Sequence, residues 1–187
     1  IWPHIKITNE NGFLVIKNES TCNLARDYGT TIVFVTIPDG TYLPLLPELE
    51  LHSKTEQTIA SEGVLHSSII RLYSIEMSDG TGTGDFRLDV ANNQLVVESN
   101  NISNFYLKGT TSQLLLNFWW GDGIFYGESL AAFTCNIYHR GSNNMYVYPL
   151  HQIDGNIYST GNLILKHQPE IQPSVIAYYT GKMIVGY

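Results

Sequence analysis

The stretch Gly84-Asp85-Phe86-Arg87-Leu88 reads as a turn followed by a short apolar strand. The same motif recurs five more times, as Ser103-Asn104-Phe105-Tyr106-Leu107, Asp122-Gly123-Ile124-Phe125-Tyr126, Asn143-Asn144-Met145-Tyr146-Val147, Gly161-Asn162-Leu163-Ile164-Leu165 and Gly181-Lys182-Met183-Ile184-Val185. Counted from Phe86, the strand starts lie 19, 19, 21, 18 and 20 residues apart. A period in this range predicts a solenoid, because each repeat can bury its apolar face only against its neighbours.

Each repeat also holds a second short apolar strand. Its copies begin at Leu95, Leu114, Phe133 and Ile153, which lie 19, 19 and 20 residues apart. No segment has a helical period, and parallel strands of one sheet are almost always connected with a right hand. The sequence therefore predicts an all-β fold, a single-stranded, right-handed parallel β-helix with about 19–20 residues per coil.

The residue before each strand predicts how the corners turn. These residues are Asp85, Asn104, Gly123, Asn144, Asn162 and Lys182. All but the lysine are types that tolerate a positive φ angle, so we expect the same left-handed corner in every coil.

The first part of the chain is less regular. We expect strands at Gly12–Ile16, Thr31–Pro38, Leu49–His52 and Ser68–Leu72 from their apolar, β-branched composition. Because the terminal repeats of a solenoid must cap an open core, residues 1–60 are interpreted as a cap with the first, irregular coils. Residues 84–187 form the regular coils, and residues 1–187 are expected to be one domain.

Composition limits the partners. Charged residues make up only 14% of the chain, apolar residues 43%, and the net charge is −7. An acidic chain of this kind cannot release counterions from phosphates, which excludes nucleic acid as a partner. No run of 18 apolar residues predicts a transmembrane segment. Because the chain starts at Ile1, we expect that an export signal or lipid-anchor cysteine has been removed.

Five segments carry a resemblance to a known family: Asn11–Lys17, Cys22–Arg26, Ile32–Pro38, Tyr138–Pro149 and Ile153–Pro169. Over about residues 7–169 they resemble the head GIN domain of putative autotransporter adhesins. Trp119-Trp120 departs from the pattern, where smaller polar residues are expected. The resemblance implies a β-helical protein that is secreted or anchored in the envelope of Gram-negative bacteria, and it brings no catalytic residues.

Few residues suggest chemistry. The glycine-rich segment Asp79–Asp85 is interpreted as a flexible turn, with calcium bound by its two aspartates as the alternative. The six histidines have no metal-ligand spacing, and no Gly-x-Ser-x-Gly motif is present. Cys135 is expected to point inward with Phe133 and Ile137, with a disulfide to Cys22 as the alternative. We predict no catalytic, metal-binding or cofactor-binding residues.

Aromatic and aliphatic side chains are expected on the outer face. If Phe86, Phe105, Ile124, Met145 and Leu163 face inward, an apolar stripe follows at Tyr106, Phe125, Tyr146 and Ile164. Such a stripe is typical of an interface, so we expect a ligand, a second copy of the chain or the tail Pro173–Tyr187 to cover it. A second outward ladder of side-chain amides is expected at Asn117, Asn136 and Asn156.

These observations favour a non-enzymatic binding or adhesion protein of the cell envelope. Its expected partner is an unidentified glycan or protein, or a second copy bound through the stripe. The rival hypothesis is a polysaccharide-active enzyme whose Trp119, Trp120 and Tyr126 stack on sugar rings. A third is a scaffold unit that polymerises end to end through open coil edges.

Overall fold

A computed structural model describes residues 5–19, 31–38, 46–75 and 82–187 of the chain. The chain divides into two compact units, Ile1–Thr36 and Ile37–Tyr187, which are described separately.

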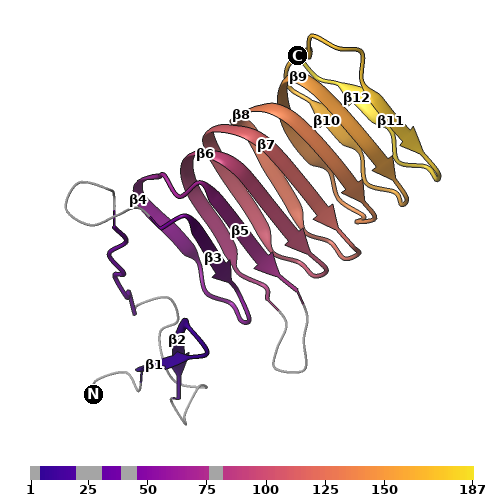
Figure 1. Ribbon diagram of the computed structural model, residues 1–187. Helices are drawn as coiled ribbons and strands as arrows, with labels where there is room; N and C mark the ends of the chain where they lie inside the picture. Colours follow the sequence, from indigo (N-terminus) through magenta and orange to yellow (C-terminus); the bar gives the residue numbers. More distant parts are fainter. Residues whose placement is uncertain (1–4, 20–30, 39–45, 76–81) are drawn as a thin grey trace. The chain divides into compact units, whose positions relative to one another are not determined.

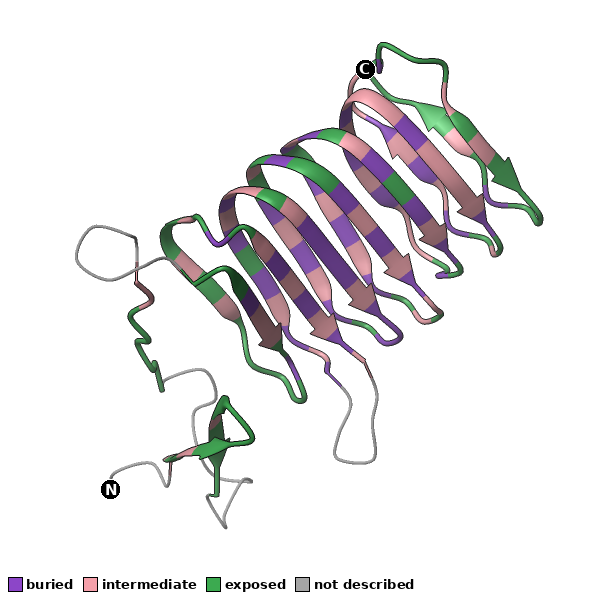
Figure 2. Ribbon diagram, viewed as in Figure 1, coloured by how far each residue is buried: buried purple, intermediate pink, exposed green. Residues whose placement is uncertain are grey.

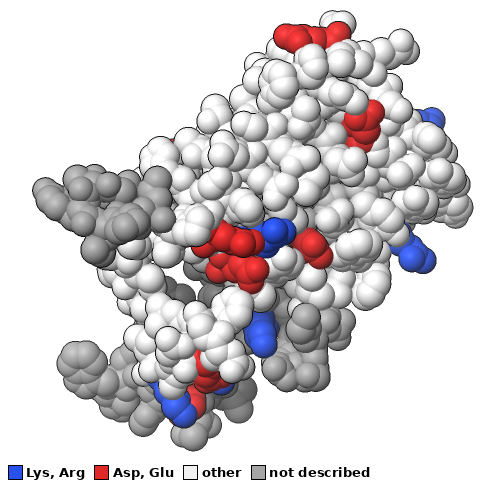
Figure 3. Space-filling model, viewed as in Figure 1, with Lys and Arg blue, Asp and Glu red and all other residues white. Residues whose placement is uncertain are grey.

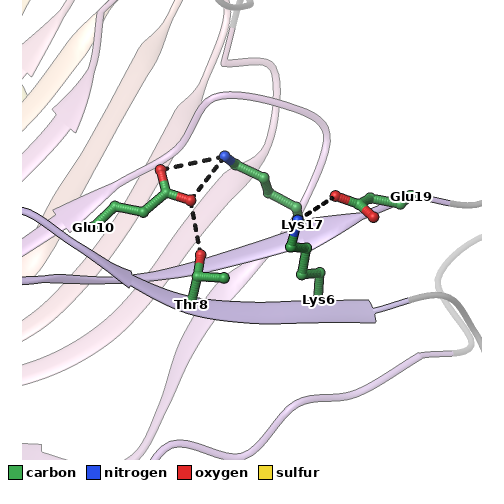
Figure 4. Close-up of polar contacts among 5 residues, drawn as sticks. All are labelled: Lys6, Thr8, Glu10, Lys17 and Glu19. Atoms are coloured by element: carbon green, nitrogen blue, oxygen red, sulfur yellow. Dashed lines mark hydrogen bonds and ion pairs between the residues drawn. The ribbon is translucent and has the colours of Figure 1, made fainter.

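The first unit contains a β-hairpin. Strands β1 (Ile5–Glu10) and β2 (Phe13–Asn18) pair antiparallel. Asn11 and Gly12 connect them with φ angles of 54° and 89°, as a two-residue turn with positive φ at both positions requires. Figure 4 shows the ion pairs across the hairpin, Lys17 to Glu10 at 3.1 Å and Lys6 to Glu19 at 3.4 Å. The strand expected at residues 12–16 is confirmed, and its antiparallel partner was not predicted.

The strand expected at Thr31–Pro38 is wrong, because these residues have no strand assignment and pair with none of the described strands. Ile32 and Phe34 are each 72% exposed. The β-branched composition thus favours an extended chain here, but no neighbouring strand supplies the hydrogen bonds of a sheet.

The second unit is a parallel β-solenoid of about seven turns (Figure 1). Its strands are β3 (Glu48–His52), β4 (Ile59–Leu65), β5 (Ile69–Ser74), β6 (Asp85–Ser99), β7 (Asn104–Phe118), β8 (Ile124–His139), β9 (Met145–Ile157), β10 (Leu163–Leu165), β11 (Ser174–Ala177) and β12 (Met183–Val185). The sheet order is β12-β10-β9-β8-β7-β6-β5-β3, while β4 pairs with β6 and β11 with β9. Every one of these pairs is parallel, which confirms the predicted parallel β-helix.

Each of the long strands β6 to β9 runs through both predicted strands of one coil. Leu95 pairs with Leu114, Leu114 with Cys135, and Cys135 with Ile153. The predicted start at Phe133 is therefore wrong by two residues. Phe133 is 48% exposed, because its neighbours Ala132 and Thr134 pair with Thr111 and Gln113, which places Phe133 on the outward face, whereas Cys135 pairs with Leu114 and points inward.

The register of the first strands differs from the sequence prediction in one coil. Phe105 pairs with Phe125, and Phe125 pairs with Met145. The ring of Phe125 is therefore buried in the core with no exposed surface, and it does not belong to the outward stripe. Ile124 occupies the corner position instead. Both positions are apolar, so only pairing with the neighbouring coils distinguishes them.

The core consists of inward columns with one residue per coil. Phe86, Phe105, Phe125, Met145 and Leu163 form one column, and none of them has exposed surface. Figure 2 shows buried and less buried residues alternating along these strands. Coil stacking thus removes a continuous apolar surface from water, which is the main stabilising contribution in a solenoid.

Side-chain amides, not left-handed residues, fix the corners. Among the described residues, Asn11 is the only non-glycine with positive φ, so the expected left-handed corners are wrong. The Asn104 side chain instead donates to Asp85 at 3.2 Å, and Asn162 donates to Asn144 at 3.1 Å. Asn162 also accepts from the backbone N–H of Lys182. At these corners, side-chain amides therefore hold successive coils in register.

The amide ladder expected at Asn117, Asn136 and Asn156 is wrong. Asn136 pairs with Leu115 and Asp154, whereas Asn117 and Asn156 both pair with Tyr138. The three asparagines therefore occupy two different columns and cannot form one ladder.

Candidate functional site

Stacked tyrosines form what we call the first aromatic row, Tyr106, Tyr126 and Tyr146, on the outer face of β7, β8 and β9. The ring centroids of Tyr106 and Tyr126 are 4.7 Å apart and those of Tyr126 and Tyr146 are 5.5 Å apart, with nearly parallel planes. The guanidinium of Arg87 lies 4.0 Å from the Tyr106 centroid. Both faces of the Tyr126 ring are therefore covered by other rings, and burial raises the pKa of its hydroxyl, with a smaller contribution from the two neighbouring tyrosines.

The structure places three of the four predicted stripe residues in one column. Tyr106, Tyr146 and Ile164 are half-buried and lie in register, with Tyr126 where Phe125 was expected. The tail does not fold back over them. Strands β11 and β12 lie in this tail and pair with β9 and β10, so the tail extends the solenoid. A second copy covering the stripe stays a prediction.

A second aromatic row runs along the carboxyl ends of β7, β8, β9 and β11. It consists of Trp119, Tyr138, Tyr158 and Tyr178. Successive ring centroids are 4.8, 4.9 and 4.8 Å apart. The Trp119 indole N–H donates to Glu98 at 3.2 Å, which anchors the first member of the row. Exposure reaches 59% at Tyr178, and the predicted residue Trp120 beside the row is 54% exposed. Of this row, the sequence prediction contained only Trp119.

A groove of about 370 Å³ opens beside the first aromatic row, over β4, β6, β7 and β8. Tyr106 and Tyr126 line it together with a polar set, Ser61, Arg87, Asp89, Lys108, Glu128 and Ser129. Sequence reasoning missed this site, because its residues come from strands that are distant in the chain.

Two bulges account for the hollow, and we call it the bulge groove. Strand β4 carries extra residues between Ala60 and Val64 opposite β6. Strand β8 carries one extra residue between Tyr126 and Ser129 opposite β7. Gly127 is required at this second bulge, because a Cβ there would lie 2.3 Å from the Phe125 ring. Bulges bend a strand and re-aim side chains, and they are frequent beside binding sites.

The charges of the bulge groove are balanced. Lys108 pairs with Asp89 at 3.2 Å. Arg87 pairs with Asp85 at 2.6 Å, and Glu128 lies 4.0 Å from Lys166. The groove itself thus presents two cationic and two anionic side chains, and Figure 3 shows how sparse charge is over most of the visible surface.

The described residues contain no cluster of side chains that could hold a metal ion. No three of their His, Cys, Asp and Glu side chains lie close enough to share a metal ion, and no helix that could span a membrane occurs among these residues. Cys135 is free and buried, and burial raises the pKa of its thiol to about 12. Its proposed disulfide partner Cys22 and the calcium candidate Asp79 lie outside the described residues.

Comparison with known proteins gives one match. Residues 1–169 match the model of a family described as putative auto-transporter adhesin, head GIN domain. This confirms the resemblance seen in the sequence. Neither the curated proteins nor the solved structures give a match.

Proposed function

We propose that this chain, which belongs to the family of the putative auto-transporter adhesin, head GIN domain, is a non-enzymatic binding module exposed at the cell envelope. The second aromatic row carries the proposal. Tyrosine and tryptophan supply large contact areas at a small cost in conformational entropy, so they are enriched where proteins bind their partners. A row of them on the surface of a chain with 14% charged residues is suited to a broad adhesive contact.

Exposure increases along the second row towards the C-terminal coils. Tyr158 is 37% exposed, Tyr178 59%, and the adjacent Tyr179 66%. Leaving such side chains in water forgoes roughly 1.5–3 kcal/mol for each one that a partner could bury. We therefore place the adhesive contact at the C-terminal part of this row.

The binding test uses a panel of immobilised glycans and matrix proteins probed with the full chain. The double variant Tyr158→Ser/Tyr178→Ser is expected to lose at least ten-fold in affinity, because both partner-facing rings are removed. Tyr148→Ser is the matched control, since Tyr148 also stacks on a neighbour, His167, at 4.6 Å, but lies outside the row. Equal losses in the two variants would contradict the assignment.

The family also supports export to the periplasm or the outer-membrane surface. The test is fractionation of cells that express the protein with its native flanking sequence, followed by protease treatment of intact cells. Recovery of the protein with the cytoplasmic fraction alone would contradict this localisation.

One observation favours a second candidate, an enzyme acting on polysaccharides. Asp89 and Glu128 both line the bulge groove beside Tyr126, and glycosidases use two carboxyl groups about 5–10 Å apart. Each carboxylate is paired with a lysine, whereas an acid catalyst is kept protonated by apolar surroundings. New reducing ends released from a polysaccharide, and lost in Glu128→Gln, would establish this alternative in place of the non-enzymatic function.

A further inference from the structure

We propose that the bulge groove is a separate site that binds one neutral sugar unit of a glycan through hydrogen bonds. This inference rests on the proposed binding function and adds a ligand class and a second location to it. The groove measures about 370 Å³, near the lower limit of the roughly 300–1,000 Å³ found for small-molecule pockets. A ligand unit of monosaccharide size therefore fits.

Charge balance selects a neutral ligand. Asp89 and Glu128 would repel an anionic sugar, and Arg87 and Lys108 would repel a cation. A sugar carries hydroxyl groups that both donate and accept. Carboxylate oxygens accept such bonds, ammonium and guanidinium groups donate them, and Ser129 can do either.

The groove charges are accessible and also held in place. The side chains of Lys108 and Glu128 are 66% and 51% exposed, so a ligand can reach both. Ser61 accepts a hydrogen bond from the backbone N–H of Asp89 at 3.0 Å, which ties the β4 bulge to β6. The polar groups are therefore partly pre-organised, which lowers the entropy cost of binding.

Ring stacking on the tyrosines of the groove is excluded by geometry. Tyr126 lies between Tyr106 and Tyr146, and Tyr106 lies between Arg87 and Tyr126. A ligand in the groove can therefore reach only the ring edges and the phenolic hydroxyls. The rival hypothesis of a sugar stacked on the face of Tyr126 does not fit this arrangement.

The test measures binding of neutral cellohexaose, laminarihexaose and mannohexaose against anionic sialyllactose and a heparin hexasaccharide, by titration calorimetry with the full chain. Wild type is expected to bind at least one neutral probe more tightly than either anionic probe. Ser129→Phe fills the groove and should weaken that binding more than ten-fold. Ser112→Phe is the matched control, since Ser112 is also an exposed serine of the outer coil surface but lies outside the groove. It should change affinity less than two-fold.

Two conservative variants keep the test valid if Ser129→Phe does not fold. Tyr126→Phe keeps the ring stack and removes only the hydroxyl, so affinity should fall about three- to ten-fold, the value of one hydrogen bond. Asp89→Asn keeps the shape of the side chain and should weaken binding by a similar factor. Full affinity in both variants would overturn the proposal.

The outcomes separate this inference from the proposed function. Preference for the anionic probes, or glycan binding that is lost in Tyr158→Ser/Tyr178→Ser but kept in Ser129→Phe, overturns the groove site and leaves the adhesive function intact. Binding to matrix proteins with no binding to any neutral probe also overturns the groove site and leaves the adhesive function intact. Neutral-glycan binding that depends on Ser129 and not on the second row supports the groove site.

Discussion

Neighbouring residues of β8 provide a direct test of the register. Phe125 is buried without exposed surface, whereas Tyr126 lies half-buried in the first aromatic row. The paired variants Phe125→Ala and Tyr126→Ala remove one ring each from the same coil. The sequence alone suggests the opposite orientation, so the two variants discriminate between the two registers.

The magnitudes follow from the environment of each ring. Truncating a fully buried phenylalanine to alanine costs about 3–5 kcal/mol, because the lost transfer energy adds to the cost of the cavity. Tyr126 stacks on Tyr106 at 4.7 Å and on Tyr146 at 5.5 Å. Each stack contributes about 0.5–1.5 kcal/mol to the stability of the fold. Part of this energy is recovered if the remaining side chains close the gap, so we expect Tyr126→Ala to lose about 1–2 kcal/mol of stability.

The assay is equilibrium unfolding in urea, followed by far-UV circular dichroism at one temperature and pH. Because both residues lie in one coil, the cooperativity of the solenoid affects the two variants alike. A difference of about 2 kcal/mol corresponds to roughly a thirty-fold difference in the unfolding equilibrium constant. A loss in Tyr126→Ala equal to or larger than that in Phe125→Ala would refute the register and, with it, the first aromatic row.

Three further predictions concern His139, the glycines Gly109 and Gly63, and Cys135. Burial lowers the pKa of His139 from 6.5 to about 4, so the protein should lose up to about 3 kcal/mol of stability as the pH falls from 6.5 towards 4. In His139→Leu, the midpoint of urea unfolding should depend less on pH over that range. Gly109→Ala should destabilise the fold by more than ~2 kcal/mol in thermal unfolding, because the added Cβ would lie 2.1 Å from a backbone oxygen. Gly63→Ala is the control: Gly63 has a φ of 112° but open space around it, so this variant should cost only about 1 kcal/mol. Iodoacetamide should leave Cys135 unmodified in the native protein and alkylate it in urea, because burial raises the pKa of this thiol to about 12. Peptide mass spectrometry measures the modification, and equal rates in the two conditions would show that the coil opens in the native protein.

Local patterns were sufficient for several features of the fold. The period of turns and apolar strands predicted the parallel solenoid, because every coil must present apolar residues at the same points. Two further features were within reach of the sequence. Asn-Gly between two segments of alternating apolar and polar residues is the strongest short-range hairpin signal, and Asn11-Gly12 provides it. The tyrosines of the second aromatic row, Tyr138, Tyr158 and Tyr178, recur at intervals of 20 residues, which is the coil period.

The register of β8 could not be read from the sequence. Ile124 and Phe125 are both apolar, so either could face the core by composition. Strand β8 contains one more residue than β7 between Tyr126 and Ser129, and pairing with both neighbouring coils decides where this residue is accommodated. A further extra residue precedes β8, because Ile124 lies 20 positions after its partner Asn104, whereas Asn104 lies 19 positions after its partner Asp85. A shift by one position exchanges the two faces of a strand, so this residue, and not the bulge that follows Tyr126, replaced Phe125 with Tyr126 in the outward row.

The sequence by itself determined the class of fold and the presence of aromatic residues on its surface, since both follow from a repeated pattern along the chain. Only the tertiary structure decided which aromatic side chains stack, how the corner amides bond and where the surface is hollow. Ser61 on β4 and Glu128 on β8 lie 67 positions apart in the sequence. They line one groove because β6 and β7 lie between β4 and β8 in the sheet. The bulge groove therefore arises from the pairing of coils and the bulges that interrupt it, and no local segment contains that information.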